Sequence, residues 1–382
     1  MSPARPRVVV LTNIVAPYRL PAFAELAKTV DLRVLFCAET GSGGCGWRLH
    51  EEIPFRHRII GGLALRRAGG DVYLSPRTLA AIARERPHVV ISGGYSTPTL
   101  YAAAYTAATR CRLAIFSDGT SHSERRLSVA QQLARRVLVR AADACIAASE
   151  AAARRFLELG VEEERVFRSP HTTDIARYWQ VALARNGHAG PGLRLLAVSR
   201  LVAGKGLDRL LLAVGRAARE ESGIELEIVG SGPEEAKLRR LATDLRLANV
   251  EFRGFVGQQE LPERYLKADA FAFPTLGDTF GIALLEAAAS GLPSVASPHA
   301  GATPEFVRHG ESGFIVDPGD TEAMAAALIA LARDPQRRSR MGRAAHEATL
   351  TRTPAAAAAG YAAAIEQALG PGKHTLRTPA WA

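Results

Sequence analysis

Residues 274–293 of the chain read PTLGDTFGIALLEAAASGLP and are its most informative stretch. The pattern predicts the end of a buried strand, a short glycine-containing loop with Asp278, and a helix that has Glu286 in its second turn. A helix N-terminus exposes unpaired N–H groups and partial positive charge, which suit a phosphate or a sugar oxygen. Because carboxylates accept hydrogen bonds on two oxygens, Glu286 suits the cis-diol of a ribose and Asp278 suits sugar hydroxyls. The alternative is a solvated loop aspartate and a glutamate on a helix surface.

A second candidate site follows the predicted strand at 193–198. A loop with two glycines comes next and leads into a predicted helix at 206–219. Arg200 and Lys205 bracket this loop, which fits a diphosphate because a guanidinium forks to oxygens and an ammonium acts as a point charge. Surface cations in an ordinary turn are the alternative. The turn at Gly230 after the next strand has only part of a dinucleotide-binding fingerprint, so by itself it is weak evidence.

Short apolar runs alternate with helical stretches along the whole chain. The predicted strands lie at 7–12, 32–37, 88–92, 112–117, 144–148, 193–198, 224–229, 250–253, 270–274, 294–297 and 314–316. Mostly apolar strands separated by helices indicate α/β domains with parallel sheets, whose ligands bind beyond the carboxyl ends of the strands. The glycine-rich run 186–192 predicts a hinge. We therefore expect an acceptor-binding domain at 1–185 and a donor-binding domain at 186–354, facing a cleft, with a C-terminal helix at 355–382 packing back on the first.

The composition is that of an ordinary globular protein, with 47% hydrophobic and 23% charged residues. No apolar run approaches the roughly eighteen residues that a membrane span needs, and the start of the chain lacks the features of a signal peptide. The four cysteines, at positions 37, 45, 111 and 145, have no C-x-x-C spacing and no histidine partners at ligand spacing. We expect reduced thiols rather than a disulfide framework or a zinc site, and hence a cytoplasmic protein.

The formal net charge of +10 does not by itself indicate a nucleic-acid partner, because the arginines are spread over both halves without a nucleic-acid-binding motif. One local cluster stands out on or just before a predicted helix at 127–142. It consists of Arg125, Arg126, Arg135, Arg136 and Arg140. Such a helix fits an anionic membrane surface, which would make the protein peripheral at the inner membrane face, and it fits a solvated helix face as well.

Several motifs follow one another in the second half. They are SRLVAGKG at 199–206, IVGSGP at 228–233, VEFRGFV at 250–256, ADAFAFPT at 268–275, the acid pair at 278–286 with GLPSV at 291–295, GATPEFV at 301–307 and GESGFIVDPGD at 310–320. In this order they resemble the family 4 retaining glycosyltransferases of the GT-B fold. The resemblance is dense over 193–350 and thinner in the first half. It implies two Rossmann-like, doubly wound parallel-sheet domains and the transfer of a sugar from a nucleotide diphosphate.

The resemblance also implies roles for individual residues of the second half. Arg200 and Lys205 match the positions that hold the donor's diphosphate, and Glu286 matches the acid that binds the ribose. Asp278 takes the place of an acid that contacts the donor sugar and is commonly Glu, so the identity of the sugar stays open. The other donor-binding residues expected from the match are Gly230, Phe255, Val256, Phe280, Gly281, Ile282 and Ala283.

The first half is expected to hold the acceptor. Its candidate residues follow predicted strands and are Tyr18, Arg19, Tyr95, Asp118 and His122. Tyr18 and Arg19 belong to a segment that resembles the Pro-Tyr-Arg loop of one branch of the family, with a packed tyrosine and a salt-bridged arginine as the alternative. Asp118 is the candidate polar group beside the donor's anomeric carbon, against a simple turn aspartate. For His122 the alternative is an ordinary residue of a surface loop.

The expected mechanism needs no metal ion and no cofactor, because the chain has no Asp-x-Asp signature and the nucleotide sugar is a substrate. The candidate catalytic residues are Asp118, Arg200, Lys205 and Asp278. The resemblance implies a retaining hexosyltransferase in which the departing phosphate oxygen accepts the acceptor's proton. A UDP-sugar is the favoured donor, and the acceptor is a hydroxyl of a lipid-linked glycan or of a small soluble molecule.

Three other functions are alternatives to this one. A GT-B nucleotide-sugar epimerase shares the fold but lacks the set formed by Arg200, Lys205, Asp278 and Glu286. A non-catalytic basic module that binds membranes or nucleic acid would explain the charge but not the dense donor-site motifs. A nicotinamide oxidoreductase would require the rest of the fingerprint that begins at Gly230.

Overall fold

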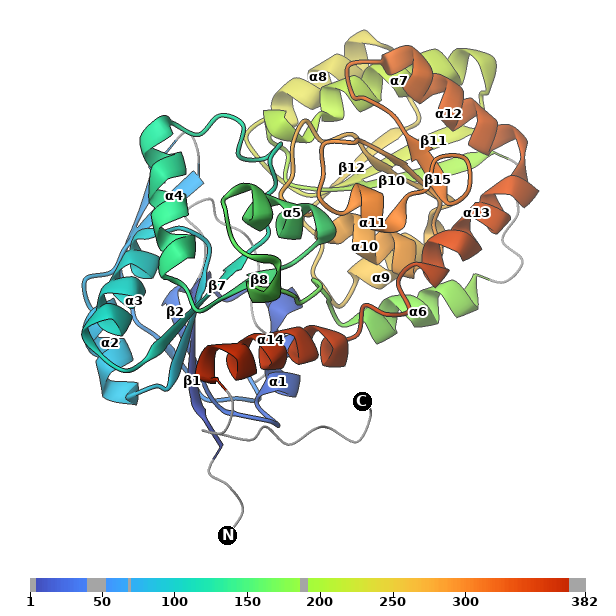
Figure 1. The fold of residues 1–382 in the computed structure, drawn as a ribbon. Coiled ribbons are helices and arrows are strands. Elements are labelled where there is room, and N and C mark those ends of the chain that lie inside the picture. Colours follow the sequence, from blue (N-terminus) through green and yellow to red (C-terminus); the bar gives the residue numbers. More distant parts are fainter. Residues whose placement is uncertain (1–4, 40–52, 68–69, 186–191, 371–382) are drawn as a thin grey trace. The chain divides into compact units, whose positions relative to one another are not determined.

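The computed structural model of the protein describes residues 5–39, 53–67, 70–185 and 192–370 (Figure 1). Its contacts divide the chain into two compact units, Met1–Thr173 with Arg352–Ala382, and Asp174–Thr351. Each unit is built on one parallel sheet with helices packed against it, so the predicted fold class of two α/β units with parallel sheets is confirmed. The predicted hinge falls at 186–192, and residues 186–191 of it lie outside the described residues.

The first unit contains a seven-stranded sheet in the order β3-β2-β1-β6-β7-β8-β9. Its strands are β1 (Arg7–Ile14), β2 (Asp31–Ala38), β3 (His57–Ile59), β6 (Val89–Gly93), β7 (Arg112–Ser117), β8 (Ala144–Ala147) and β9 (Val166–Arg168). All neighbouring pairs are parallel. An antiparallel hairpin, β4 (Leu63–Arg67) and β5 (Gly70–Leu74), lies between β3 and β6 in the sequence.

The helices of the first unit are α1 (Leu20–Leu26), α2 (Thr78–Glu85), α3 (Thr97–Ala108), α4 (Val129–Ala141), α5 (Glu150–Glu158) and α14 (Pro354–Leu369), with 3-10 turns at Pro17–Arg19 and Glu163–Arg165. Alternate residues of the central strands point to opposite faces of the sheet. Val8 and Val10 join the core that includes residues of α1 and α14, whereas Val9 and Leu11 join the core that includes residues of α2, α3 and α5. Helices therefore cover both faces.

The second unit contains a six-stranded parallel sheet in the order β12-β11-β10-β13-β14-β15. Its strands are β10 (Leu193–Val198), β11 (Ile224–Val229), β12 (Val250–Gly254), β13 (Ala270–Phe273), β14 (Ser294–Ala296) and β15 (Gly313–Ile315). Its helices are α6 (Ile175–Ala184), α7 (Leu207–Glu220), α8 (Glu235–Asp244), α9 (Leu261–Lys267), α10 (Ile282–Ala289), α11 (Thr303–Phe306), α12 (Thr321–Arg333) and α13 (Pro335–Glu347), with a 3-10 turn at Ala203–Lys205.

The strand order of each sheet reverses at one point. The chain moves outward from β1 to β3 and then returns to the other side of β1 with β6; in the second unit β13 returns beside β10 in the same way. At such a reversal the connections leave the sheet in opposite directions, and the crevice between them is the usual ligand site of an open α/β sheet. The loops after β1 and β6, and those after β10 and β13, are therefore the places to look for function.

The boundary between the two units differs from the predicted domain boundary. The second unit begins at Asp174 rather than at residue 186, because α6 packs on α9 and α10. The C-terminal helix α14 belongs to the first unit, where it contacts α1, β8 and β9 (Figure 1). A Cβ on Gly360 would lie 2.0 Å from the carbonyl oxygen of Arg168, so this glycine in an alanine-rich helix permits close contact with the end of β9. Residues 371–382 of the predicted terminal helix lie outside the described part of the chain.

Candidate functional site

The loops after β10 and β13 pack directly on each other at the carboxyl edge of the second sheet. The backbone N–H of Leu276 donates a 2.9 Å hydrogen bond to the carbonyl oxygen of Gly204. Gly206 has φ of +64°, and a Cβ there would lie 2.1 Å from the carbonyl oxygen of Pro274. Only glycine combines that conformation with that approach. The sequence GKG at 204–206 thus holds Lys205 against the loop that carries Asp278.

Lys205 and Asp278 form an ion pair with 2.5 Å between Nζ and Oδ2. Their side chains are 23% and 18% exposed, so the pair is shielded but reachable from solvent. The backbone N–H of Asp278 donates to the carbonyl oxygen of His299 at 3.1 Å, which joins this loop to the one after β14. Arg200 lies at the start of the loop after β10, and its side chain is exposed. The predicted diphosphate lysine and the predicted sugar-binding acid are therefore in contact.

The N-terminus of α10 follows Asp278 after three residues. Gly281 is the N-cap with φ of 107°, and a Cβ there would lie 2.7 Å from the Phe273 ring. No side chain caps this helix end in the described structure. Ile282 and Ala283 are its first residues, and the N–H groups of a first helical turn have no carbonyl partner within the helix. Backbone donors and positive dipole charge at this end suit an anion.

Glu286 lies one turn further along α10 and is only 4% exposed. Its Oε2 accepts a 3.0 Å hydrogen bond from the Tyr265 hydroxyl, and Tyr178 donates a second. Burial raises the pKa of the Glu286 carboxyl to about 7, although both tyrosine hydrogen bonds act in the opposite direction. The tyrosine rings meet edge to face at 5.5 Å. The carboxyl group is thus fixed in orientation and titrates near neutrality.

The raised pKa of Glu286 predicts a pH-dependent stability. Between its ordinary value of 4.5 and about 7, the folded protein holds a proton that the unfolded chain has lost, so the free energy of unfolding falls as the pH rises through this range. At about 1.4 kcal/mol per pKa unit, the fall amounts to about 3 kcal/mol. Chemical denaturation at several pH values measures it, and Glu286→Gln, which cannot ionise, should lose this component. An equal dependence of the unfolding free energy on pH in the wild type and in Glu286→Gln would contradict this prediction.

The other predicted donor residues lie on neighbouring loops of the second unit. Gly230 has φ of +136°, and a Cβ on it would lie 1.8 Å from the carbonyl oxygen of Ser199, so the loops after β10 and β11 also touch. Phe255 follows β12 and is 48% exposed, whereas Val256 is partly buried against the core. Phe280 is buried and meets Phe306 edge to face.

In the first unit a polar cluster lies at the carboxyl edge of the sheet. His171 Nε2 lies 3.5 Å from Asp118 Oδ2, and the His171 ring packs edge to face on Tyr18 and Phe116. The Arg19 guanidinium lies over the Phe116 ring at 5.1 Å and donates to Thr12 Oγ1 at 3.1 Å. The Nε of Arg19 is buried and has no hydrogen-bond partner within the described residues. The structure thus brings Tyr18 and Arg19, which follow β1, close to Asp118, which follows β7, around the His171 ring.

Asp118 is held in its charged form. Burial alone would raise the pKa of its carboxyl, but the hydrogen bond and charge of His171, together with the charge of Arg19, lower it to about 2. The side chain is 31% exposed, so a ligand can reach it. A carboxylate with this pKa accepts hydrogen bonds at neutral pH and is a weak general base.

Tyr95 follows β6 and belongs to a different network, which includes residues of α4. Its hydroxyl is hydrogen bonded to Ser117, and the Arg135 guanidinium lies over its ring at 4.7 Å. Burial raises the pKa of Tyr95. His122 is half-buried in the loop after β7, where its carbonyl oxygen accepts from Arg125 Nη1 at 2.9 Å. The structure therefore engages Tyr95 with α4 rather than with Arg19 and Asp118.

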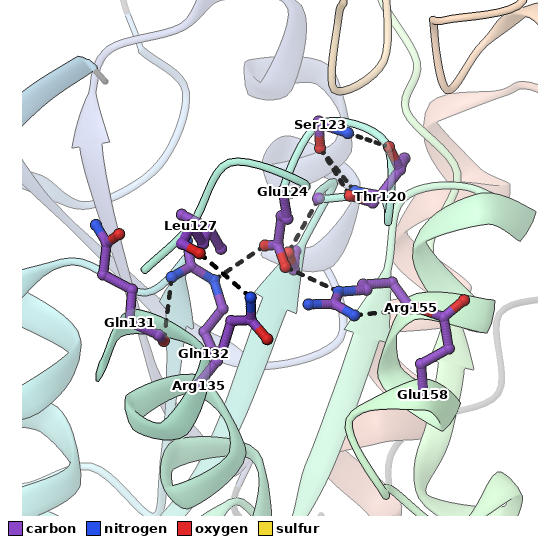
Figure 2. Close-up of polar contacts among 12 residues, drawn as sticks. Thr120, Ser123, Glu124, Leu127, Gln131, Gln132, Arg135, Arg155 and Glu158 are labelled. Carbon is purple, nitrogen blue, oxygen red and sulfur yellow. Dashed lines mark hydrogen bonds and ion pairs between the residues drawn. The ribbon is translucent and has the colours of Figure 1, made fainter. Parts of the chain in front are cut away.

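Glu124 is the centre of that network, and Figure 2 shows it between two arginines. Its Oε1 accepts from Arg135 Nε at 3.0 Å and its Oε2 from Arg155 Nε at 2.9 Å. Glu124 is 8% exposed. A Cβ on Gly119 would lie 2.6 Å from Oε1, so a glycine there leaves room for the carboxylate. One buried acid thereby ties the loop that carries Asp118 to α4 and α5.

Glu124→Gln is expected to destabilise the protein by about 3 kcal/mol, since removing one member of a buried ion pair leaves its partners without compensation. Arg135 and Arg155 would both lose a charged acceptor while their side chains stay 17% and 16% exposed. Chemical denaturation measures the loss. Glu158→Gln is the matched control, because Glu158 pairs with the same Arg155 but is 49% exposed, and should cost less than about 1 kcal/mol. Equal losses in the two variants would contradict the central place of Glu124.

Several site residues were not predicted from the sequence. His171 follows β9, a three-residue strand with no fully buried position, which has no apolar run to reveal it. Recognition of that strand would have placed His171 at the same sheet edge as Asp118. Tyr265 and Tyr178 come from α9 and α6, and helical periodicity marks them only as core residues. Glu124 gave no signal at all, because its partners are distant in the sequence.

Two parallel-sheet α/β units, with loops gathered at each point of strand reversal, define a GT-B glycosyltransferase fold. A solved structure with this fold is Anabaena HepE in complex with UDP and glucose, with a TM-score of 0.75 and 21% sequence identity over 94% of this chain and 98% of that one. Residues 183–348 match the family model for glycosyl transferases group 1, and residues 24–177 match that for glycosyltransferase family 4. The chain belongs to the family 4 glycosyltransferases, which confirms the resemblance drawn from its motifs.

Named relatives match this chain over part of its length. The GDP-mannose-dependent alpha-(1-6)-phosphatidylinositol monomannoside mannosyltransferase of Mycobacterium tuberculosis is 35% identical over 205 residues, 52% of this chain and 51% of that protein. The amylovoran biosynthesis glycosyltransferase AmsK of Erwinia amylovora is 41% identical over 150 residues, 37% and 36% of the two chains. The chain thus matches about half the length, or less, of these relatives. None of the helices within the described ranges has the length and hydropathy to cross a membrane.

Proposed function

We propose that the protein transfers a sugar from a nucleotide diphosphate to a hydroxyl acceptor, with retention of configuration and without a divalent metal ion. The observation that carries this proposal is the contact of Lys205 with Asp278 at the point of strand reversal in the second sheet. It joins a cation suited to phosphate and an acid suited to sugar hydroxyls within one shielded site.

The donor's diphosphate is proposed to take Lys205 as its main cation. An anion at this place would share the Lys205 ammonium with Asp278 and meet the uncapped N-terminus of α10. The exposed Arg200 is free to fold over the diphosphate, and Ser199 offers a buried hydroxyl that lacks a partner among the residues described. Lys205, Arg200 and the helix N-terminus would together stabilise the charge that grows on the leaving diphosphate, the role that a metal ion has in other transferases.

The two acids are proposed to divide the rest of the donor. Glu286 receives the ribose hydroxyls, for which its tyrosine partners hold the carboxyl group in one orientation. Asp278 receives a hydroxyl of the sugar, and its Oδ1 also lies 3.4 Å from the N–H of Phe280. Since Asp is one methylene shorter than Glu, the sugar hydroxyl would have to approach this loop more closely, or through a water molecule.

The chemical step exchanges one bond for another at the anomeric carbon. The bond to the diphosphate oxygen breaks, the bond to the acceptor oxygen forms on the same face, and the acceptor's proton passes to the departing phosphate oxygen. The low pKa of Asp118 supports this route, because a carboxylate with a pKa of about 2 is poorly matched to removing a hydroxyl proton at neutral pH. Asp118 is instead proposed to stay ionised and to favour the positive charge that develops on the sugar ring.

We propose a kind of nucleotide and a chemical class of acceptor for this protein. UDP is the nucleotide expected from the sequence, and the HepE structure contains UDP, whereas the mycobacterial relative is named as GDP-mannose-dependent. Names of relatives include a phosphatidylinositol mannoside and the polysaccharide amylovoran as the molecules acted on or made. A hydroxyl of a lipid-linked or soluble glycan is therefore the acceptor class that we propose.

Thermal unfolding with UDP, GDP, ADP and dTDP tests the donor site. We expect one nucleoside diphosphate to raise the unfolding temperature, and its sugar conjugates to be hydrolysed slowly without an acceptor. NMR of the transferred sugar should then show the anomeric configuration of the donor. Stabilisation by none of the four, or an inverted product, would contradict the proposal, and epimerised donor without transfer would favour the epimerase alternative.

A further inference from the structure

Helix α4 exposes a stripe of branched apolar side chains. Val129, Leu133 and Val137 are 82%, 60% and 59% exposed. They are spaced by four residues, so each lies roughly 40° further around the helix than the one before, and all three share one face. A solvated helix face would carry polar residues at these positions. The stripe is therefore an apolar surface that packing within the first unit does not explain.

Arginines surround this stripe. Arg136 and Arg140 lie on the same side of the helix as the stripe, and both are exposed. Arg125 and Arg126 are exposed in the segment just before the helix. The chain contains no Asp or Glu between Glu124 and Asp143 to offset them. We call Val129, Leu133, Val137, Arg136 and Arg140 together the α4 outer face.

The opposite face of α4 is firmly attached to the first unit. Leu138 and Val139 are buried in the core beside β7 and β8. Arg135 donates to Glu124, and Gln132 Nε2 donates to the carbonyl oxygen of Leu127 at 3.2 Å, as Figure 2 shows. A capping box between Ser128 and Gln131 closes the N-terminus of the helix. The exposure of the α4 outer face thus belongs to a well-anchored helix and not to a loosely packed one.

We propose that the α4 outer face docks on a lipid bilayer that contains anionic lipids. The three apolar side chains would enter the boundary between headgroups and acyl chains, while the arginines reach lipid phosphates. With 13 residues the helix is about 20 Å long, which suits a position in the plane of the interface. Three side chains on one helix offer far less surface than the roughly 800 Å² that each partner buries in a stable protein interface. The small area favours a bilayer as the occupant.

This docking goes beyond the proposed function and does not depend on it. A transferase with a soluble acceptor gains nothing from a membrane-facing helix, so docking would select the lipid-linked class of acceptor. It would also bring the loop that carries Asp118 close to the bilayer, because Glu124 connects that loop to α4 within the same unit. Lipid binding and donor binding can be measured separately, so failure of one leaves the other standing.

Flotation with vesicles tests the proposal on the full chain. We expect binding to vesicles of phosphatidylcholine with about 30% phosphatidylglycerol, weak binding to phosphatidylcholine alone, and weaker binding at high salt. Leu133→Gln with Val137→Gln should reduce the partition coefficient tenfold or more, because the apolar stripe is then lost. Arg136→Gln with Arg140→Gln should reduce it by about fivefold for each arginine.

A matched control changes the same residue types elsewhere. Leu183 is 62% exposed on α6 and Arg240 is exposed on α8, so Leu183→Gln with Arg240→Gln should bind vesicles like the wild type. Thermal unfolding should be unchanged in all variants, since every altered side chain is exposed. Absence of binding by the wild type, or equal binding by the α4 variants and the control, would overturn the proposal. So would light scattering that shows a dimer dissociated by Leu133→Gln with Val137→Gln, since a second copy would then cover the face.

Discussion

Lys205→Ala is expected to lower the rate of sugar transfer about a hundredfold or more, which is the scale of losing one electrostatic stabiliser in an active site. The substitution removes the cation proposed for the leaving diphosphate. It also leaves Asp278 charged and without its 2.5 Å partner, so the acid would repel the diphosphate. Both effects act against the same transition state. Steady-state turnover with the nucleotide sugar selected by thermal unfolding measures the loss.

The control for this variant is Lys237→Ala, which removes a lysine that is 67% exposed on α8 and pairs with Glu234. It should keep turnover within about twofold of the wild type, since exposed ion pairs contribute little. The unfolding temperature of Lys205→Ala should stay near that of the wild type, because the side chain is part of a loop and not of the core. Normal turnover by purified Lys205→Ala would remove the main support for the donor site.

Glu286→Ala is expected to lower transfer by about a hundredfold as well, through loss of the carboxyl oxygens that accept from the ribose hydroxyls. Burial adds a second effect. Because Tyr265 and Tyr178 donate to this carboxyl group, its removal leaves Tyr178 without that acceptor and leaves Tyr265 with only the carbonyl oxygen of Ala283 at 3.3 Å, at a cost of about 1–3 kcal/mol of stability. Glu286→Gln keeps an acceptor for the tyrosines and so separates the catalytic effect from the structural one.

A comparison of donors sharpens this prediction. The wild type should discriminate between a ribonucleotide sugar and its 2′-deoxy analogue, because one hydrogen bond to Glu286 is missing in the analogue. Glu286→Ala should treat the two donors alike, since the acceptor is gone from the protein. Transfer rates for the four combinations form a double-mutant cycle. Equal discrimination in the wild type and in the variant would show that Glu286 does not bind the ribose.

Much of the fold was predictable because the central strands are buried on both faces. The predicted strands at 193–198 and 224–229 coincide with β10 and β11, which lie between helical stretches; β10 is mostly apolar, and β11 is apolar apart from Glu225 and Glu227. The short outer strands β3 and β9 were missed because three residues with little burial leave no such run. The unit boundary was also missed, since the assignment of α6 depends on its packing against α9 and α10.

The sequence predicts where the site residues lie along the sheet edge better than it predicts the side chains that surround them. Asp278 and Lys205 follow neighbouring strands, and the carboxyl ends of parallel strands meet at one edge, so their contact follows from the strand order. The sequence gives no reason for Glu286 to be buried against two tyrosines from α6 and α9, because those contacts exist only once the helices pack. The partnership of His171 with Asp118 was hidden for the same reason.

The central claim is that the loops after β10 and β13 hold a nucleoside diphosphate through Lys205. Calorimetric titration with the preferred nucleoside diphosphate, and with the corresponding nucleoside, tests it most directly. We predict that the diphosphate binds the wild type at least about tenfold more tightly than the nucleoside, and that Lys205→Ala removes most of this difference. Equal affinity of the wild type for both ligands, or a difference that survives in Lys205→Ala, would contradict the account.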